Sequence, residues 1–160
     1  MTLCHTYHPS PVGKLLLVAS EKGLRALLWE HEAKERIKVG DTKENKTDPI
    51  LQKTKIELDE YFSGKRKKFT IKLDPVGTDF QQNVWLALRQ IPYGETRSYG
   101  EQAKMIGKPK AFRAVGAANG KNPISIIVPC HRVIGGNGSL TGFGGGLPAK
   151  QKLLELEGVL

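Results

Sequence analysis

A cysteine, a histidine and an arginine stand next to one another at Cys130-His131-Arg132, directly after Pro129. A free thiol with a pKa of about 8.5 needs a base or positive surroundings before it becomes a nucleophilic thiolate, and both residue types adjoin it here. A lone cysteine after an apolar run is often only a small core residue. Its neighbours nevertheless favour a reactive cysteine, with His131 as the candidate base.

Only two cysteines, Cys4 and Cys130, occur in the 160 residues, at opposite ends of the chain, so we expect no disulfide framework. We expect no metal and no cofactor. The possible zinc ligands of the N-terminal part include a single thiol and lack the spacing of a zinc site: Cys4, His5, His8 and His31. Stoichiometric zinc in the purified protein would contradict this. The absence of a signal-peptide pattern and of a long apolar run favours an intracellular protein, cytoplasmic or, in a eukaryote, nuclear. The net charge of +9 favours a polyanionic partner such as nucleic acid.

Residues 1–76 are predicted to form a small β-rich subdomain. Short apolar runs separated by proline and glycine are typical of strands joined by turns, and an aspartate followed by proline is typical of a helix start. The expected elements are strands at 3–7, 15–18 and 24–29, a surface connection or frayed helix at 31–46, a helix from Asp48-Pro49 to Gly64, a strand at 69–73 and a linker at 74–77.

Residues 77–160 are predicted to form a helical subdomain, which gives an α/β (α+β) fold overall. Two capping patterns indicate helix starts, and an alanine-rich helix after a glycine-containing turn completes a helix-turn-helix. Seven glycines between 135 and 146 predict a loop that brings backbone close to another group. The expected elements are a helix from Thr78 to about 90, a helix from Ser98 to Gly107, a helix over 111–118, a buried strand at 124–128 and the loop at 135–146.

The segment Pro129-Cys130-His131-Arg132-Val133, preceded by Asn122-Pro123 and followed by glycines, resembles the signature of the 6-O-alkylguanine-DNA alkyltransferases, also called methylated-DNA–protein-cysteine methyltransferases. The resemblance extends from about residue 78 to 158. It implies that Cys130 accepts an alkyl group, that His131 takes the thiol proton through a water molecule, and that Glu157 orients the histidine, as in a nucleophile, base and orienter triad. It also implies that Asn122 braces the turn. In the plainer interpretation, Glu157 is a solvated charge and Asn122 a turn former.

The implied chemistry requires the damaged nucleotide to leave the base stack, because the guanine oxygen lies inside the duplex. The resemblance implies that the second helix of the helix-turn-helix enters the minor groove, which is about 6 Å wide and suits small side chains. Arg113 would fill the space left by the flipped base, and Tyr99 would crowd the phosphate. Ser98, which begins the first of the two helices, is included among the DNA-binding residues. In the plainer interpretation, Tyr99 is a half-buried core aromatic and Arg113 is a surface charge.

The resemblance assigns the flipped guanine to the glycine-rich loop. Backbone groups of Val133 and Gly144 would contact the base, and Phe143 would line its pocket. Many relatives carry tyrosine at the position of Phe143, so this chain lacks a hydroxyl there. A purely hydrophobic wall at this place would change the preference between methyl and larger alkyl groups.

The predicted function is DNA repair by irreversible, stoichiometric transfer of a methyl or alkyl group from 6-O-alkylguanine in double-stranded DNA to Cys130 of a monomer, with alkylated thymine as an open second substrate. A lesion sensor that flips the base and recruits other repair proteins is the main alternative, but such relatives lack the acceptor cysteine. A cysteine hydrolase would regenerate its thiol, and adjacent residues rarely meet as nucleophile and base. A helix-turn-helix regulator would need paired half-sites and major-groove readout, which the alanine-rich helix does not favour.

Overall fold

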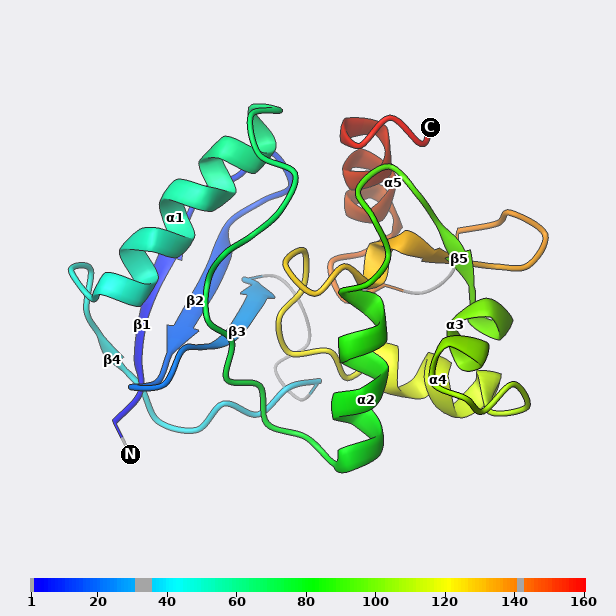
Figure 1. Cartoon of the computed structure of the whole chain (residues 1–160). Coiled ribbons are helices and arrows are strands. Elements are labelled where there is room, and N and C mark those ends of the chain that lie inside the picture. The colour runs from blue at the N-terminus through cyan, green and yellow to red at the C-terminus, as the bar shows by residue number, and fades with distance from the viewer. Residues whose placement is uncertain (1, 31–35, 141–142) are drawn as a thin grey trace.

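A sheet covered by one long helix and a group of shorter helices lie side by side in the computed structural model (Figure 1). The structure describes residues 2–30, 36–140 and 143–160. The four-stranded sheet and the long helix come from the N-terminal part and the shorter helices from the C-terminal part, which confirms the predicted fold class. The elements are β1 (Cys4–His8), β2 (Leu15–Ala19), β3 (Leu24–Trp29), β4 (Lys43–Glu44), α1 (Pro49–Phe62), α2 (Asp79–Leu88), β5 (Arg97–Ser98), α3 (Tyr99–Met105), α4 (Phe112–Asn119), the 3-10 turn η1 (Cys130–Arg132), β6 (Val133–Ile134) and α5 (Leu147–Leu156).

The N-terminal sheet has the strand order β3-β2-β1-β4. Strands β1, β2 and β3 pair antiparallel, as successive strands joined by short turns do, and β4 joins β1 in parallel. Helix α1 packs on β1 and β2. It begins where Asp48 accepts hydrogen bonds from first-turn N–H groups, and it buries Leu51, Leu58 and Tyr61. The three predicted strands and this helix are therefore confirmed within a residue or two.

The predicted strand at 69–73 is wrong. Within this segment Leu73 forms one isolated bridge, with Leu24, and no ladder follows it. The Thr70 N–H donates instead to a carboxylate oxygen of Glu57 at 2.8 Å. At the bridge, the Leu24 N–H of β3 donates to the Lys72 carbonyl and the Asp74 N–H donates to the Leu24 carbonyl, each at 2.8 Å. The alternation of apolar residues thus correctly indicated an extended segment, but its pairing with β3 does not continue to Thr70.

Part of the predicted connection at 31–46, including His31, lies outside the described residues. Beyond it the chain passes along the sheet edge and forms β4, which pairs with β1. Within 2–30, 36–140 and 143–160, no three His, Cys, Asp or Glu side chains gather closely enough to hold a metal ion. Within the same ranges, no helix has the length and apolar character that crossing a membrane requires.

Helices α3 and α4 form the predicted helix-turn-helix, packed on α2. The predicted capping box at Ser98 is present, and the predicted cap at Thr78 is also a full capping box. The Thr78 hydroxyl accepts from the Gln81 N–H, and the Ser98 hydroxyl accepts from the Glu101 N–H, each at 3.1 Å. In each case the side chain three residues on accepts a bond from the backbone N–H of the capping residue. These local bonds satisfy N–H groups that a helix start leaves unpaired, which is why the sequence alone located both starts.

Residues 124–128 are buried, as predicted, but they form turns and not the predicted strand. The Ile127 N–H donates to the Ser125 carbonyl at 2.8 Å, a bond within the turn. Ile126 has a φ of 73°, in the left-handed region that a β-branched residue seldom adopts. The β-branched residues correctly indicated burial, but these local bonds replace a strand ladder.

The N-terminal sheet directly supports the segment that precedes Cys130. The Leu27 N–H of β3 donates to the Pro123 carbonyl at 2.9 Å, and the Ser125 N–H donates to the Leu27 carbonyl at 3.2 Å. The indole of Trp29 packs edge-on against Phe143, with 5.2 Å between ring centroids. Buried residues of both parts belong to one hydrophobic cluster. The two parts therefore pack on a shared core that positions the turn around the cysteine.

Candidate active site around Cys130

Cys130 begins the 3-10 turn η1 and lies on the wall of a cavity of about 380 Å³. Its N–H donates to the Val128 carbonyl at 2.8 Å, which fixes the turn. The residue as a whole is partly exposed, although its thiol lies in buried surroundings. The other residues that line the cavity come from both parts of the chain: Arg36, Tyr99, Gly116, Asn119, Gly120, Ser125, Phe143 and Gly144.

Asn122 braces the turn on the protein side of the cysteine. Its side-chain nitrogen donates to the Val128 carbonyl at 2.8 Å, and its side-chain oxygen accepts from the Ile124 N–H at 3.0 Å. The asparagine is fully buried, and it also hydrogen-bonds the Cys130 thiol. One amide therefore holds both the irregular segment and the sulfur, which matches the bracing position expected from the sequence.

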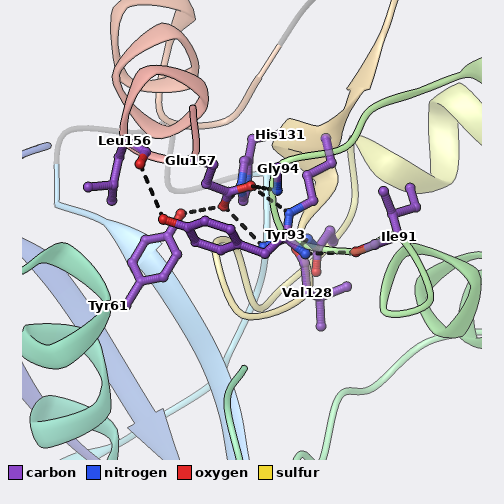
Figure 2. Close-up of polar contacts among 10 residues, drawn as sticks. Tyr61, Ile91, Tyr93, Gly94, Val128, His131, Leu156 and Glu157 are labelled. Atoms are coloured by element: carbon purple, nitrogen blue, oxygen red, sulfur yellow. Dashed lines mark hydrogen bonds and ion pairs between the residues drawn. The ribbon is translucent and has the colours of Figure 1, made fainter. Parts of the chain in front are cut away.

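A buried network of polar groups surrounds the carboxylate of Glu157 (Figure 2). His131 is completely buried, and its Nε2 lies 2.7 Å from Oε2 of Glu157. Arg132 donates to both oxygens of this carboxylate, from Nε to Oε1 at 2.8 Å and from Nη2 to Oε2 at 3.1 Å. The Tyr61 hydroxyl donates to Oε2 at 2.5 Å, and the Gly94 N–H donates to Oε1 at 3.4 Å. The structure thus brings the predicted histidine and glutamate into direct contact.

The charges of this network follow from its contacts. Burial acts to raise the pKa of Glu157, but hydrogen bonds and charges from His131 and Arg132 outweigh it and lower the pKa to about 2. Glu157 is therefore an anion, and the hydrogen between it and His131 belongs to Nε2. Burial lowers the pKa of His131 below its ordinary value, so the imidazole is neutral. Its Nδ1 has no hydrogen-bond partner among the described residues and is the nitrogen that can accept a proton.

The Cys130 thiol is protonated in the resting protein. Burial raises its pKa, and the hydrogen bond from Asn122 and the positive charges of Arg36 and Lys150 only partly oppose this effect. The thiol thus has positive neighbours, but they are Arg36 and Lys150 and not the adjacent Arg132, whose guanidinium pairs with Glu157. These charges do not by themselves create a standing thiolate. A base must remove the proton during the reaction, which is the role that the neutral His131 can serve.

The remaining sequence-predicted residues are divided between the cavity and its surroundings. Tyr99, Phe143 and Gly144 line the cavity beside Cys130. Ser98 caps α3, one residue before Tyr99. The Val133 carbonyl accepts a hydrogen bond from the buried Lys150 ammonium at 2.7 Å, and the Val133 N–H donates to the Cys130 carbonyl. Arg113 does not line the cavity; it is exposed on α4, near the ring of Phe112.

Three residues at the site were not predicted from the sequence. Arg36 donates from Nη1 to the carbonyls of Gly120 and Asn122, at 3.0 and 3.1 Å, and borders the cavity. Lys150 is buried on the inner face of α5, and Tyr61 reaches the network from α1. Arg36 lies in a charged stretch and Tyr61 on an apolar helix face, so neither carries a local signal. Lys150 lies among the apolar positions of α5, and this pattern could have indicated a buried lysine from the sequence.

Comparison with known proteins assigns both parts of the chain to one family. Residues 79–159 match the family model described as "6-O-methylguanine DNA methyltransferase, DNA binding domain", and residues 3–75 match the one described as "6-O-methylguanine DNA methyltransferase, ribonuclease-like domain". The chain therefore belongs to the 6-O-methylguanine DNA methyltransferase family.

Similar proteins include two named methylated-DNA–protein-cysteine methyltransferase. That of Methanosarcina acetivorans is 53% identical over 150 residues, 93% of this chain and 94% of the relative. That of Haemophilus influenzae is 49% identical over 158 residues, 97% of this chain and 86% of the relative. The crystal structure of Mycobacterium tuberculosis OGT in complex with DNA has a TM-score of 0.86 and 47% identity, and the match covers 98% of this chain and 92% of that one.

Proposed function

We propose that this protein repairs DNA by direct damage reversal, moving the methyl or alkyl group of a 6-O-alkylguanine onto Cys130 in one irreversible turnover. The family and the names of the relatives support alkyl transfer, and the DNA complex of the similar Mycobacterium tuberculosis protein supports DNA as the partner. The observation that carries the proposal is the position of Cys130 on the cavity wall, next to a neutral buried histidine whose far nitrogen is held by Glu157.

The proposed reaction moves one proton and one alkyl group. His131 takes the thiol proton at Nδ1 through a water molecule, and Glu157 stabilises the imidazolium that forms. The sulfur of Cys130 then attacks the alkyl carbon in line, so a carbon–sulfur bond forms as the carbon–oxygen bond breaks. The electron pair of the broken bond goes to guanine, which takes up a proton that balances the one removed from the thiol. A thioether is not hydrolysed under mild conditions, so each molecule acts once.

The cavity is proposed as the place of the flipped base. Its volume of about 380 Å³ falls in the range of small-molecule sites, roughly 300–1,000 Å³. Phe143 forms an apolar wall, and Gly144 permits close approach of backbone to the base. The Val133 carbonyl already accepts from Lys150, but a carbonyl oxygen has two lone pairs, so it remains able to accept from guanine.

The helix-turn-helix is proposed as the DNA-binding element. On α4, Arg113 and the alanines at 114 and 117 are exposed, which suits entry into a narrow minor groove. Arg113 would occupy the space of the extruded base, and Tyr99, which lines the cavity, would crowd the phosphate and favour rotation. Ser98 would act with them by holding the start of α3.

We further propose that residues 1–76 and 77–160 act as two subdomains of a monomer in the cytoplasm. All the side chains assigned to the reaction come from one chain, so no second copy is needed to complete the site. A reducing compartment would keep Cys130 available as a thiol.

Transfer of a radiolabelled methyl group from 6-O-methylguanine in duplex DNA to the protein tests the proposal. Cys130→Ser should take up no label while still binding the duplex. Cys4→Ser, which removes the other thiol from a partly buried position in β1, should take up label like the unaltered protein. Equal labelling of Cys130→Ser and the unaltered protein would refute Cys130 as the acceptor.

A further inference from the structure

Tyr61 connects the N-terminal part of the protein to the histidine of the candidate active site. It lies in α1, is completely buried, and donates from its hydroxyl to Oε2 of Glu157 at 2.5 Å, across 96 residues of sequence (Figure 2). From this geometry we infer that Tyr61 is a positioning residue for alkyl transfer, which sets how strongly Glu157 holds the Nε2 hydrogen of His131. The inference rests on the proposed function, since it concerns the same proton transfer.

The contacts of the carboxylate show how the hydroxyl can act. Oε2 of Glu157 accepts from Tyr61, from His131 at 2.7 Å and from Arg132 at 3.1 Å. Oε1 accepts from Arg132 and from the Gly94 N–H. Donors to a carboxylate share its negative charge, so a short bond from the tyrosine leaves less charge on the oxygen that holds the histidine. Tyr61 and His131 therefore compete for the same atom.

The tyrosine is held in place and remains a donor. Its ring packs against Phe62, Phe69 and Tyr93, with centroid distances of 5.2, 5.3 and 6.2 Å. Burial and the negative charge of Glu157 raise its pKa far above the ordinary value, so the hydroxyl keeps its hydrogen throughout the working pH range. The network thus contains a fixed neutral donor that neither titrates nor moves with the histidine.

The charged groups around the histidine come from two segments of the C-terminal part. Glu157 and Lys150 face it from the C-terminal helix and its end, and Arg132 follows it in the 3-10 turn. Around Glu157 lie Tyr61, Arg132 and Tyr93, of which only Tyr61 belongs to the N-terminal part. Residues 1–76 would therefore contribute to the chemistry and not only to the support of the active half.

Replacement of Tyr61 by phenylalanine tests the inference, with Tyr93→Phe as a matched control. Both changes remove a buried or half-buried phenolic hydroxyl from the same aromatic cluster, but the Tyr93 hydroxyl donates to the Leu156 carbonyl at 3.2 Å and not to the carboxylate. Loss of the Tyr61 hydroxyl leaves more charge on Glu157, which stabilises the imidazolium and raises the pKa of His131. The pH at which transfer falls off on the acid side should therefore rise in Tyr61→Phe and stay unchanged in Tyr93→Phe.

The measurement is the rate of methyl transfer from duplex DNA between pH 5 and 8, together with the NMR titration of the His131 ring. A rise of about one pH unit would make transfer about tenfold slower at a fixed pH on the acid side. A tyrosine that only fills space would lower stability without moving either titration. Identical acid-side profiles in Tyr61→Phe, Tyr93→Phe and the unaltered protein would overturn the inference.

Two further outcomes remain informative. If Tyr61→Phe does not fold, 3-fluorotyrosine at position 61 keeps the ring and donates more strongly, so the acid-side fall should move to lower pH; no movement would overturn the inference. If the unaltered protein transfers no methyl group, the proposed function fails. In that case the NMR titration of His131 alone decides whether Tyr61 tunes the histidine.

Discussion

Replacing Glu157 by glutamine should destabilise the protein by about 3 kcal/mol at pH 7. A carboxylate whose pKa is lowered from 4.5 to about 2 on folding favours the folded state, and each pH unit of lowering is worth about 1.4 kcal/mol. The cost of breaking a buried ion pair gives a similar estimate of the loss in stability, since removing one partner costs about 3–5 kcal/mol. The variant would leave the guanidinium of Arg132 buried without its anion.

Urea unfolding of Glu157→Gln and of the unaltered protein measures this difference. Glu155→Gln is the control, because Glu155 is an exposed glutamate on the same helix. The stabilisation from Glu157 is complete above pH 4.5 and is lost as the pH falls toward 2, so the two unfolding free energies should converge over that interval. If the unfolding free energies of Glu157→Gln and the unaltered protein differ by less than about 1 kcal/mol at pH 7, as for an exposed ion pair, then Glu157 is not a strongly stabilised buried anion.

Three further changes probe the site and its DNA contacts. Lys150→Met removes a buried positive charge near Cys130, so the pKa of the thiol should rise and its reaction with iodoacetamide at pH 7 should slow about tenfold. Gly145→Ala should cost about 1–3 kcal/mol in urea unfolding, because the new methyl would lie 2.6 Å from the Trp29 indole. Arg113→Ala should slow repair of duplex DNA by about tenfold or more while sparing the free base, since only the duplex requires unstacking.

Each of these changes has a matched control. Lys152→Met alters an exposed lysine of the same helix as Lys150, and equal thiol reactivity in both variants would contradict the electrostatic argument. Gly136→Ala adds a methyl with nothing within 4 Å, and a cost as large as that at Gly145 would point away from steric overlap. Lys53→Ala removes a charge from α1, far along the chain from α4, and a matching loss on duplex DNA would indicate a general charge effect.

The parts of the fold that were predicted from sequence are those set by local bonds. The capping boxes at Thr78 and Ser98 and the Asp48 cap fix helix starts through contacts two or three residues apart, so they are legible in the sequence. The segments predicted as strands at 69–73 and 124–128 each form a single bridge with β3, at Leu24 and Leu27. The pairing does not extend into a ladder, because Glu57 takes the Thr70 N–H in one case and turn bonds replace strand bonds in the other.

The residues of the candidate site also fall into those that a local sequence motif predicts and those that only the packing of distant segments brings in. Cys130, His131, Asn122 and Glu157 were predicted because the motif resembles a known family, and the structure brings them together, while their catalytic roles remain proposals. Tyr61 appeared in the sequence only as one apolar position of a helix face. Its contact with Glu157 depends on how α1 packs against the C-terminal part, and no pattern within either segment specifies that.

The mass of the intact protein after mixing with a duplex carrying one 6-O-methylguanine decides whether Cys130 is a single-use acceptor. Each molecule should gain the mass of one methylene group and no more, peptide mapping should find it on Cys130, and the duplex should lose its methyl group. Tight binding to the duplex without a gain in mass, or removal of more methyl groups than there are protein molecules, would rule out single-turnover transfer to Cys130.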